Sequence, residues 1–308
     1  MSTRKAAIAD DSPSWQVTVY GLGIQTNVAL PELIPGAAVI DVVIRLAALP
    51  PRPHDHKDDI YYARATDREA YLSWRHVGAF LVRDGREILV DPECEERVLR
   101  SYLLGPVLGV VLRQRGRLVM HASGIDIRGR VAAFIGDAGQ GKSTIAAALY
   151  ERGYPLITDD LLAFHPINGT GAPMVAPGFP TLKLRPDALT AFGMHPDTLR
   201  SSHPLEEKYL HGASRGFSLC ARPLGSICVL TRGPEGGLEP LGAQASIAAL
   251  LRHTSSPRPE LVSVDDVPAR LRQCADIINR VPIYRLTVPR SFEGLPGVVS
   301  LIESRMKG

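Results

Sequence analysis

The stretch GDAGQGKST, residues 136–144, is the part of this 308-residue sequence that most constrains its fold. The small apolar run VAAFI precedes it, and the helix-forming AAALYERG follows two residues later. Gly136, four residues, and then Gly141, Lys142 and Ser143 match the pattern G-x-x-x-x-G-K-[ST], which requires a strand before it and a helix after it. Because both flanks fit, the stretch predicts a loop that holds phosphates.

Each part of this loop has a physical role in binding a nucleoside triphosphate. Glycines let backbone N–H groups turn toward anionic oxygens, and the first turn of the following helix adds its positive end. Lys142 reaches the β and γ phosphates, and the hydroxyl of Ser143 binds Mg²⁺. We therefore expect a nucleoside triphosphate with Mg²⁺ to bind this loop. The residues expected to bind the nucleotide are Gly136, Asp137, Ala138, Gly139, Gln140, Gly141, Lys142, Ser143 and Thr144.

Two adjacent carboxylates, Asp159 and Asp160, end the short apolar strand expected at YPLIT. Since successive side chains of a strand alternate in direction, the two aspartates should have different tasks. One can hold Mg²⁺ opposite Ser143, while the other accepts a proton from an attacking hydroxyl. We assign the metal to Ser143 and Asp160 and the proton to Asp159, although the reverse assignment of the two aspartates fits the sequence equally.

Residues 118–160, LVMHASGIDIRGRVAAFIGDAGQGKSTIAAALYERGYPLITDD, resemble the catalytic core of the HPr kinase/phosphorylase family. A strand with His121, a hairpin, a Gly-rich loop, a helix and Asp-Asp follow one another at that family's spacing. The resemblance is closest to the HPr-kinase-related enzymes of lasso peptide biosynthesis, which phosphorylate the terminal Ser of a precursor peptide. A softer likeness covers most of residues 15–235.

The resemblance implies a catalytic fold like that of phosphoenolpyruvate carboxykinases, ATP and Mg²⁺ as cofactors, and a peptide or protein with an acceptor Ser as substrate. It places His121 in the active site with the two aspartates. Thr144 stands where HPr kinases have a glutamate, and no Arg-Gly-Ile-Gly type segment associated with phosphorolysis is found. The resemblance therefore does not extend to the reverse reaction. Lys183 and Lys208 are candidates for a further cation, and we count Lys208 among the catalytic residues.

The pattern of elements predicts an α/β (α+β) protein. Short β-branched or aromatic runs separated by Gly, Pro and Asp fill residues 15–92, which favours a β-rich N-terminal domain after a disordered tail at 1–14. Residues 93–308 are expected to form the P-loop kinase domain. Within it we expect helices at 143–152, 243–253, 266–281 and near 296–306, and strands at 225–231 and 283–288.

Composition and charge exclude several kinds of partner. The 35 basic and 32 acidic side chains nearly cancel, and they form no dense basic run, so we expect no nucleic acid. The most apolar segment, residues 102–112, is about half the roughly 20 residues that span a membrane, which predicts a buried helix and no membrane contact. The start lacks the apolar stretch of a secretory signal, so the expected location is the cytoplasm. A homo-oligomer is compatible with the sequence.

Three other functions remain open at this point. An ATPase would use water as the acceptor, and a metabolite kinase or carboxykinase would use a small molecule. A nucleotide-sensing module would bind ATP without transferring its phosphate. The sequence does not identify the peptide or its binding groove.

Overall fold

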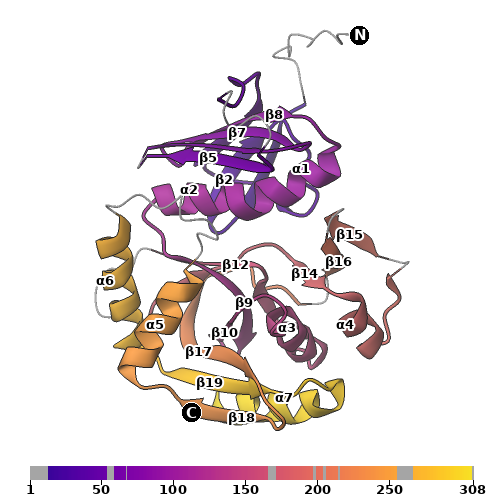
Figure 1. Ribbon diagram of the computed structural model, residues 1–308, viewed down its shortest axis with the longest axis vertical. Helices are drawn as coiled ribbons and strands as arrows, with labels where there is room; N and C mark the ends of the chain where they lie inside the picture. The colour runs from indigo at the N-terminus through magenta and orange to yellow at the C-terminus, as the bar shows by residue number, and fades with distance from the viewer. Residues whose placement is uncertain are drawn as a thin grey trace. The chain divides into compact units, whose positions relative to one another are not determined.

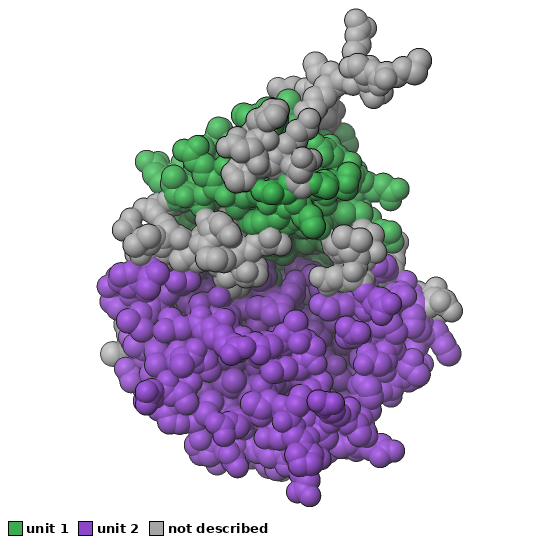
Figure 2. Space-filling model, in the orientation of Figure 1, with its two compact units in different colours: residues 1–115 green, residues 116–308 purple. Residues whose placement is uncertain are grey.

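The chain forms two compact units, Met1–Arg115 and Gly116–Gly308 (Figure 2). The computed structural model describes residues 13–53, 59–66, 68–165, 171–196, 199–203, 206–213, 216–254 and 266–306. All but the last two residues of the tail expected at 1–14 lie outside these ranges. The break between the units falls after Arg115 rather than after residue 92, so residues 93–115 group with the N-terminal unit.

The N-terminal unit is built on one eight-stranded sheet (Figure 1). Two of its pairings, β2 with β4 and β4 with β8, are parallel, and the others are antiparallel. The order across the sheet is β3 (Ile34–Pro35), β1 (Trp15–Val19), β2 (Leu22–Thr26), β4 (Val42–Leu46), β8 (Glu87–Pro92), β7 (Gly78–Arg83), β6 (Glu69–Trp74) and β5 (Tyr61–Ala65). The β-rich character expected for this region is confirmed.

A helical segment of residues 96–114 explains why the N-terminal unit extends past residue 92. It consists of α1 (Glu96–Tyr102), a π-helical turn (Leu103–Val107) and α2 (Leu108–Gln114). Most of its apolar residues are buried, as predicted for residues 102–112, and α2 contacts β7. Pro106 has no N–H for the regular helical bond, and the π turn accommodates that interruption.

The C-terminal unit contains a second large sheet. The order is β10 (Arg130–Ile135), β9 (Val119–Ile127), β12 (Leu161–Phe164), β13 (Met174–Ala176), β17 (Arg222–Arg232), β19 (Ile283–Val288) and β18 (Gly237–Pro240). The short β11 (Leu156–Thr158) pairs with β9. Strand β17 runs parallel to both β10 and β19, so these three strands have their carboxyl ends at the same edge.

Helices cover this sheet through two separate hydrophobic cores. One core includes α3 (Lys142–Glu151) and α7 (Leu295–Arg305), and the other includes α5 (Ala243–His253) and α6 (Asp266–Ile278). Successive side chains of β10 point to opposite faces of the sheet and so enter different cores. Phe134 belongs to the first core and Ile135 to the second. The protein is therefore mixed α/β, as predicted, and the helices expected from the sequence form within a few residues of the expected bounds.

A three-stranded sheet adjoins α3 in the same unit. It consists of β14 (Thr181–Leu184), β16 (Glu206–Gly212) and β15 (Arg200–His203), and α4 (Pro186–Ala191) follows β14. Strand β14 contacts α3, which brings Lys183 toward the start of that helix. Across the described part of the chain, none of the helices combines the length and apolar character needed to cross a membrane.

Candidate functional site

The Gly-rich loop, residues 136–141, joins the end of β10 to the start of α3. Gly139 and Gly141 have φ values of 80° and 99°, a backbone conformation that other residues rarely adopt. Gly141 directly precedes α3, whose first backbone N–H groups have no partners within the helix. A strand, a Gly-rich turn and a helix start in this order form a site suited to an anion.

The side chain of Lys142 folds over this loop. Its Nζ atom donates hydrogen bonds to the carbonyl oxygens of Gly136 at 2.7 Å and of Asp137 at 3.2 Å. Burial lowers the pKa of Lys142, although the neighbouring Asp159 and Asp160 act in the opposite direction. The Nζ atom of Lys142 is thus held against the loop beside the start of α3.

Asp159 stands directly across from Ser143. Its Oδ1 atom accepts hydrogen bonds from the hydroxyls of Ser143 at 3.0 Å and Ser123 at 2.6 Å, and its Oδ2 atom accepts one from the backbone N–H of Lys183 at 2.8 Å. We expected Asp160 to be the partner of Ser143, but the structure places Asp159 there. The local backbone explains the difference, because Asp160 has a φ of 79° and its side chain takes a different direction.

Asp160 lies between a lysine and a histidine. Its Oδ2 atom is 2.6 Å from Nζ of Lys183, and its Oδ1 atom is 3.2 Å from Nδ1 of His121. Burial raises the pKa of Asp160, but Lys183 and His121 outweigh that effect and hold the pKa well below its ordinary value. Asp160 is therefore ionised at neutral pH, and the two aspartates have different environments, as expected.

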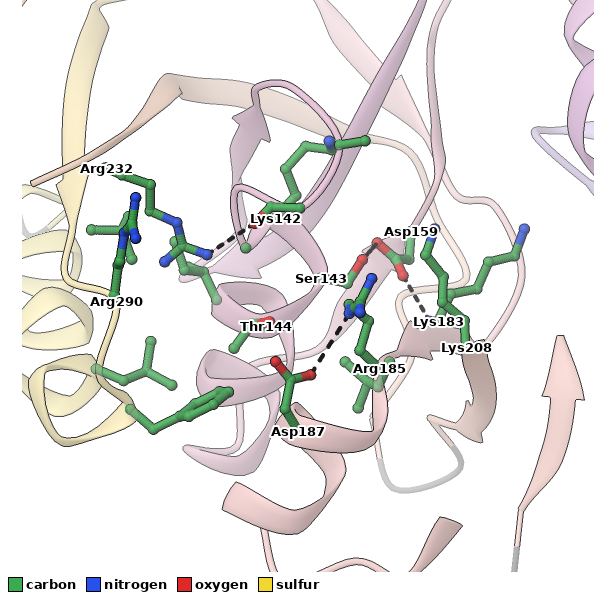
Figure 3. Close-up of a pocket in the computed structure, with 18 of the residues that line it drawn as sticks. Lys142, Ser143, Thr144, Asp159, Lys183, Arg185, Asp187, Lys208, Arg232 and Arg290 are labelled. Carbon is green, nitrogen blue, oxygen red and sulfur yellow. Dashed lines mark hydrogen bonds and ion pairs between the residues drawn. The ribbon is translucent and has the colours of Figure 1, made fainter. Parts of the chain in front are cut away.

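A single pocket connects these groups (Figure 3). Its cations are Lys142, Lys183, Arg185, Lys208, Arg232 and Arg290, and its carboxylates are Asp159, Asp160 and Asp187. The excess of positive charge favours an anionic ligand. Lys208 lines the pocket and His121 does also, so all five residues that we predicted to be catalytic meet here.

Six of the nine residues expected to bind the nucleotide line this pocket. They are Ala138, Gly139, Gly141, Lys142, Ser143 and Thr144. The other three support the loop from outside the pocket. Gly136 offers its carbonyl to Lys142, and the side-chain oxygen of Gln140 accepts a hydrogen bond from the backbone N–H of Asp137. The carboxylate of Asp137 pairs with Arg252 of α5.

The two ends of the pocket differ in chemistry. The carboxylate end consists of Asp159, Asp160, Lys183 and His121, and the arginine end consists of Arg232, Pro289, Arg290 and Phe292. Figure 3 shows Arg232 and Arg290 on one side of Ser143 and Thr144, with Asp159, Lys183 and Lys208 on the other.

Sequence reasoning missed the arginine end. Arg232 donates hydrogen bonds to the carbonyl oxygens of Gly139 at 2.9 Å and Pro289 at 3.0 Å, and Gly139 is 93 residues away in the sequence. No short motif marks such residues. A general rule could have pointed to them, because ligands of α/β sheets bind at the carboxyl ends of parallel strands. Arg232 is the last residue of β17, and Arg290 follows the end of β19.

The oxygen donors of the site fit magnesium. No group of three or more His, Cys, Asp or Glu side chains gathers around a metal position within the described ranges. Mg²⁺ is commonly bound by one or two carboxylates together with substrate phosphates, and it needs no full set of protein ligands. The Ser143 hydroxyl and the Asp159 carboxylate, 3.0 Å apart, are the pair that fits this pattern.

Comparison with known proteins gives a distant similarity to solved structures. No protein-family model and no curated protein matches the sequence. Among solved structures, the chain is similar to the HPr(Ser) kinase/phosphatase from Coxiella burnetii, at 14% identity and a TM-score of 0.30, over 61% of this chain and 88% of that chain. A similarity of this size gives no basis for transferring a function.

Proposed function

We propose that this protein is an ATP- and Mg²⁺-dependent kinase that phosphorylates a serine hydroxyl of a peptide or protein. The observation that carries the proposal is the pairing of Ser143, at the start of α3, with Asp159, at the end of β11, at 3.0 Å. Lys142 and Asp160 line the same pocket. A phosphate site, a pair of oxygen donors for Mg²⁺ and a second carboxylate are the parts that phosphoryl transfer needs.

The Gly-rich loop and Lys142 bind the phosphates in this proposal. Ser143 and Asp159 hold Mg²⁺, which when bound supplies positive charge to the phosphates. Ser123 and the backbone N–H of Lys183 fix the carboxylate of Asp159 in its orientation. The metal role thus belongs to Asp159, the reverse of the assignment that we favoured from the sequence.

Asp160 accepts the proton of the acceptor hydroxyl. Lys183 and His121 keep its carboxylate ionised and restrict its orientation. Because the transition state of phosphoryl transfer is loose, most of the rate comes from alignment and from positive charge near the transferred group. Lys142 and Lys208 supply such charge from this chain.

The acceptor that we propose is the C-terminal Ser of a lasso peptide precursor, and the place of the reaction is the cytoplasm. The support for this finer assignment is the sequence resemblance of residues 118–160. The pocket itself supports only a hydroxyl acceptor near Asp160. Substrate identity therefore has to be tested with peptides.

The test is a phosphorylation assay read by mass spectrometry. The protein is incubated with ATP, Mg²⁺ and a peptide ending in Ser, with a peptide ending in Ala as the matched control. We expect a gain of phosphate on the Ser peptide alone. The Asp160→Asn variant should lose transfer while it retains ATP binding, and Lys142→Ala should weaken both.

Other outcomes would favour the alternatives. Sustained ATP hydrolysis that no peptide alters would identify an ATPase. Phosphorylation of a small metabolite with all peptides inert would identify a metabolite kinase. ATP binding without any transfer, and unchanged in the Asp160→Asn variant, would indicate a nucleotide-sensing module.

A further inference from the structure

The arginine end of the pocket has a chemistry that phosphate binding and catalysis do not use. Arg232 and Arg290 lie beside Phe292, whose side chain is 36% exposed, and Leu295 completes this side. A charged group next to an exposed aromatic ring suits a ligand with an anionic part joined to a flat apolar part. A nucleotide has this composition.

We propose that the arginine end binds the nucleoside of ATP, with the base against Phe292. The inference rests on the proposed function in one respect, that the phosphates lie on the Gly-rich loop. A nucleoside attached to those phosphates has two directions in which to leave the loop. The carboxylate end holds the reacting groups and two negative charges, so the direction that remains is toward Arg232 and Phe292.

An apolar cavity adjoins this end of the pocket and is large enough for a base. It is lined by Ala148, Phe192, Phe292, Leu295, Pro296 and Val299, among others. Its volume is about 210 Å³, whereas an engineered apolar cavity of roughly 150 Å³ is known to accept benzene. Phe292 and Leu295 line both the pocket and this cavity, so the cavity lies directly beside the arginine end.

Helix α3 connects the phosphates with this cavity. Thr144 lines the pocket, and Ala148, one turn further along the same helix face, lines the cavity. One helical turn advances about 5.4 Å, a step on the scale of a sugar between a phosphate and a base. The ribose can therefore lie along the face of α3 between Thr144 and Ala148.

The segment that carries Phe292 is held in place by contacts within the chain. The hydroxyl of Ser291 accepts a hydrogen bond from the backbone N–H of Glu293 at 3.1 Å and caps the 3₁₀ turn Phe292–Gly294. Gly294 approaches Pro289 so closely that an added Cβ atom would lie 2.8 Å from the proline ring. Arg232 ties Pro289 to Gly139 through two hydrogen bonds. This fixed geometry lowers the entropic cost of stacking a base.

Calorimetry with two ligands, ATP and inorganic tripolyphosphate, tests the inference, because the second has the phosphates without the nucleoside. We expect the wild-type protein to bind ATP more tightly than tripolyphosphate. Phe292→Ala should weaken ATP binding about tenfold, the size expected for the loss of one base–aromatic contact, and should leave tripolyphosphate binding unchanged. Leu301→Ala is the matched control, since Leu301 is equally exposed, lies on α7 and lines neither cavity.

Any other binding result overturns the inference in an identifiable way. Equal affinities of the wild-type protein for ATP and tripolyphosphate would show that the nucleoside makes no contact. An equal loss for both ligands in Phe292→Ala would show that the variant damages the phosphate site, and no loss for either would show that the base lies elsewhere. If the wild-type protein binds neither ligand, the proposed kinase function fails as well. If ATP binds as expected but no peptide is phosphorylated, the kinase function fails and the nucleoside site stands.

Discussion

The carboxylate end and the arginine end of the pocket are held together in different ways. At the carboxylate end, Asp159 is buried and accepts three hydrogen bonds, and Asp160 lies between Lys183 and His121. At the arginine end, Phe292 is partly exposed, and the hydrogen bonds of Arg232 go to backbone carbonyls. The side-chain interactions that would position reacting groups are therefore concentrated at the carboxylate end, and the arginine end offers an exposed ring and guanidinium groups.

The largest effect is expected from Asp160→Asn. An amide in place of the carboxylate cannot accept the proton of the acceptor, so phosphoryl transfer should fall by about 10²- to 10⁴-fold. The affinity for ATP should change little, because Asp160 does not touch the Gly-rich loop. Single-turnover transfer and ATP binding, measured on the same preparation, check both parts. Asp276→Asn, on the surface of α6, is the control.

This variant also separates the two aspartates. If Asp160→Asn retains transfer while Asp159→Asn loses it at saturating Mg²⁺, then Asp159 is the proton acceptor and our assignment is reversed. If Asp159→Asn mainly raises the Mg²⁺ concentration needed for half-maximal transfer, Asp159 is the metal ligand, as we propose.

A smaller loss is expected from Ser123→Ala. The hydroxyl of Ser123 is 2.6 Å from Asp159 and touches no other group of the pocket, so it acts by orienting that carboxylate. Removal of a group that orients a metal ligand typically costs about 10- to 100-fold in metal affinity. The Mg²⁺ dependence of ATP binding should shift accordingly, with tripolyphosphate binding without Mg²⁺ unaffected. Ser226→Ala provides a buried serine of the same sheet as control, and an equal shift in it would refute the positioning role of Ser123.

The two ends also differ in how far the sequence could predict them. The Gly-rich loop, Asp159 and Asp160 lie within one strand–loop–helix–strand run, so local pattern and spacing were sufficient to group them. The exact partner of Ser143 was not predictable, because it depends on the positive φ of Asp160. The mixed α/β class and the main helices were predictable from periodicity.

The remaining features depend on contacts between distant segments. Arg232 and Phe292 reach the pocket only because β17 and β19 pair in parallel beside β10. Lys183 meets Asp160 only because β14 lies against α3. The assignment of residues 93–115 to the N-terminal unit likewise depends on the packing of α2 on β7. Single-sequence patterns carry no information on such pairings.

Lys183→Met should change the pH dependence of transfer at the carboxylate end. Burial raises the pKa of Asp160 and Lys183 lowers it, so removing the lysine should raise this pKa. A higher pKa leaves more of the carboxyl protonated at a given acidic pH. The acid limb of the pH–rate profile should therefore move to higher pH.

The matched variant for this test is Lys183→Arg, which restores the positive charge. We expect it to return the acid limb toward the wild-type position. The backbone N–H of Lys183 that binds Asp159 is retained in both variants, so the Mg²⁺ dependence should stay constant. An unchanged pH profile in Lys183→Met would contradict the role of Lys183 in keeping Asp160 ionised.

The smallest effect is expected from Arg232→Gln at the arginine end. The two hydrogen bonds of Arg232 to the carbonyl oxygens of Gly139 and Pro289 are exposed. Their loss in the glutamine variant should cost on the order of 1 kcal/mol, which corresponds to about a fivefold loss of ATP affinity. Transfer at saturating ATP should be unchanged, because the reacting groups lie at the other end. Titrations of ATP binding and of transfer rate check the two parts, with Arg285→Gln, an exposed arginine of β19, as control. A loss of transfer that saturating ATP does not restore would mean that the Gly-rich loop transmits the change to Ser143, and the two ends would then have to be treated as one catalytic unit.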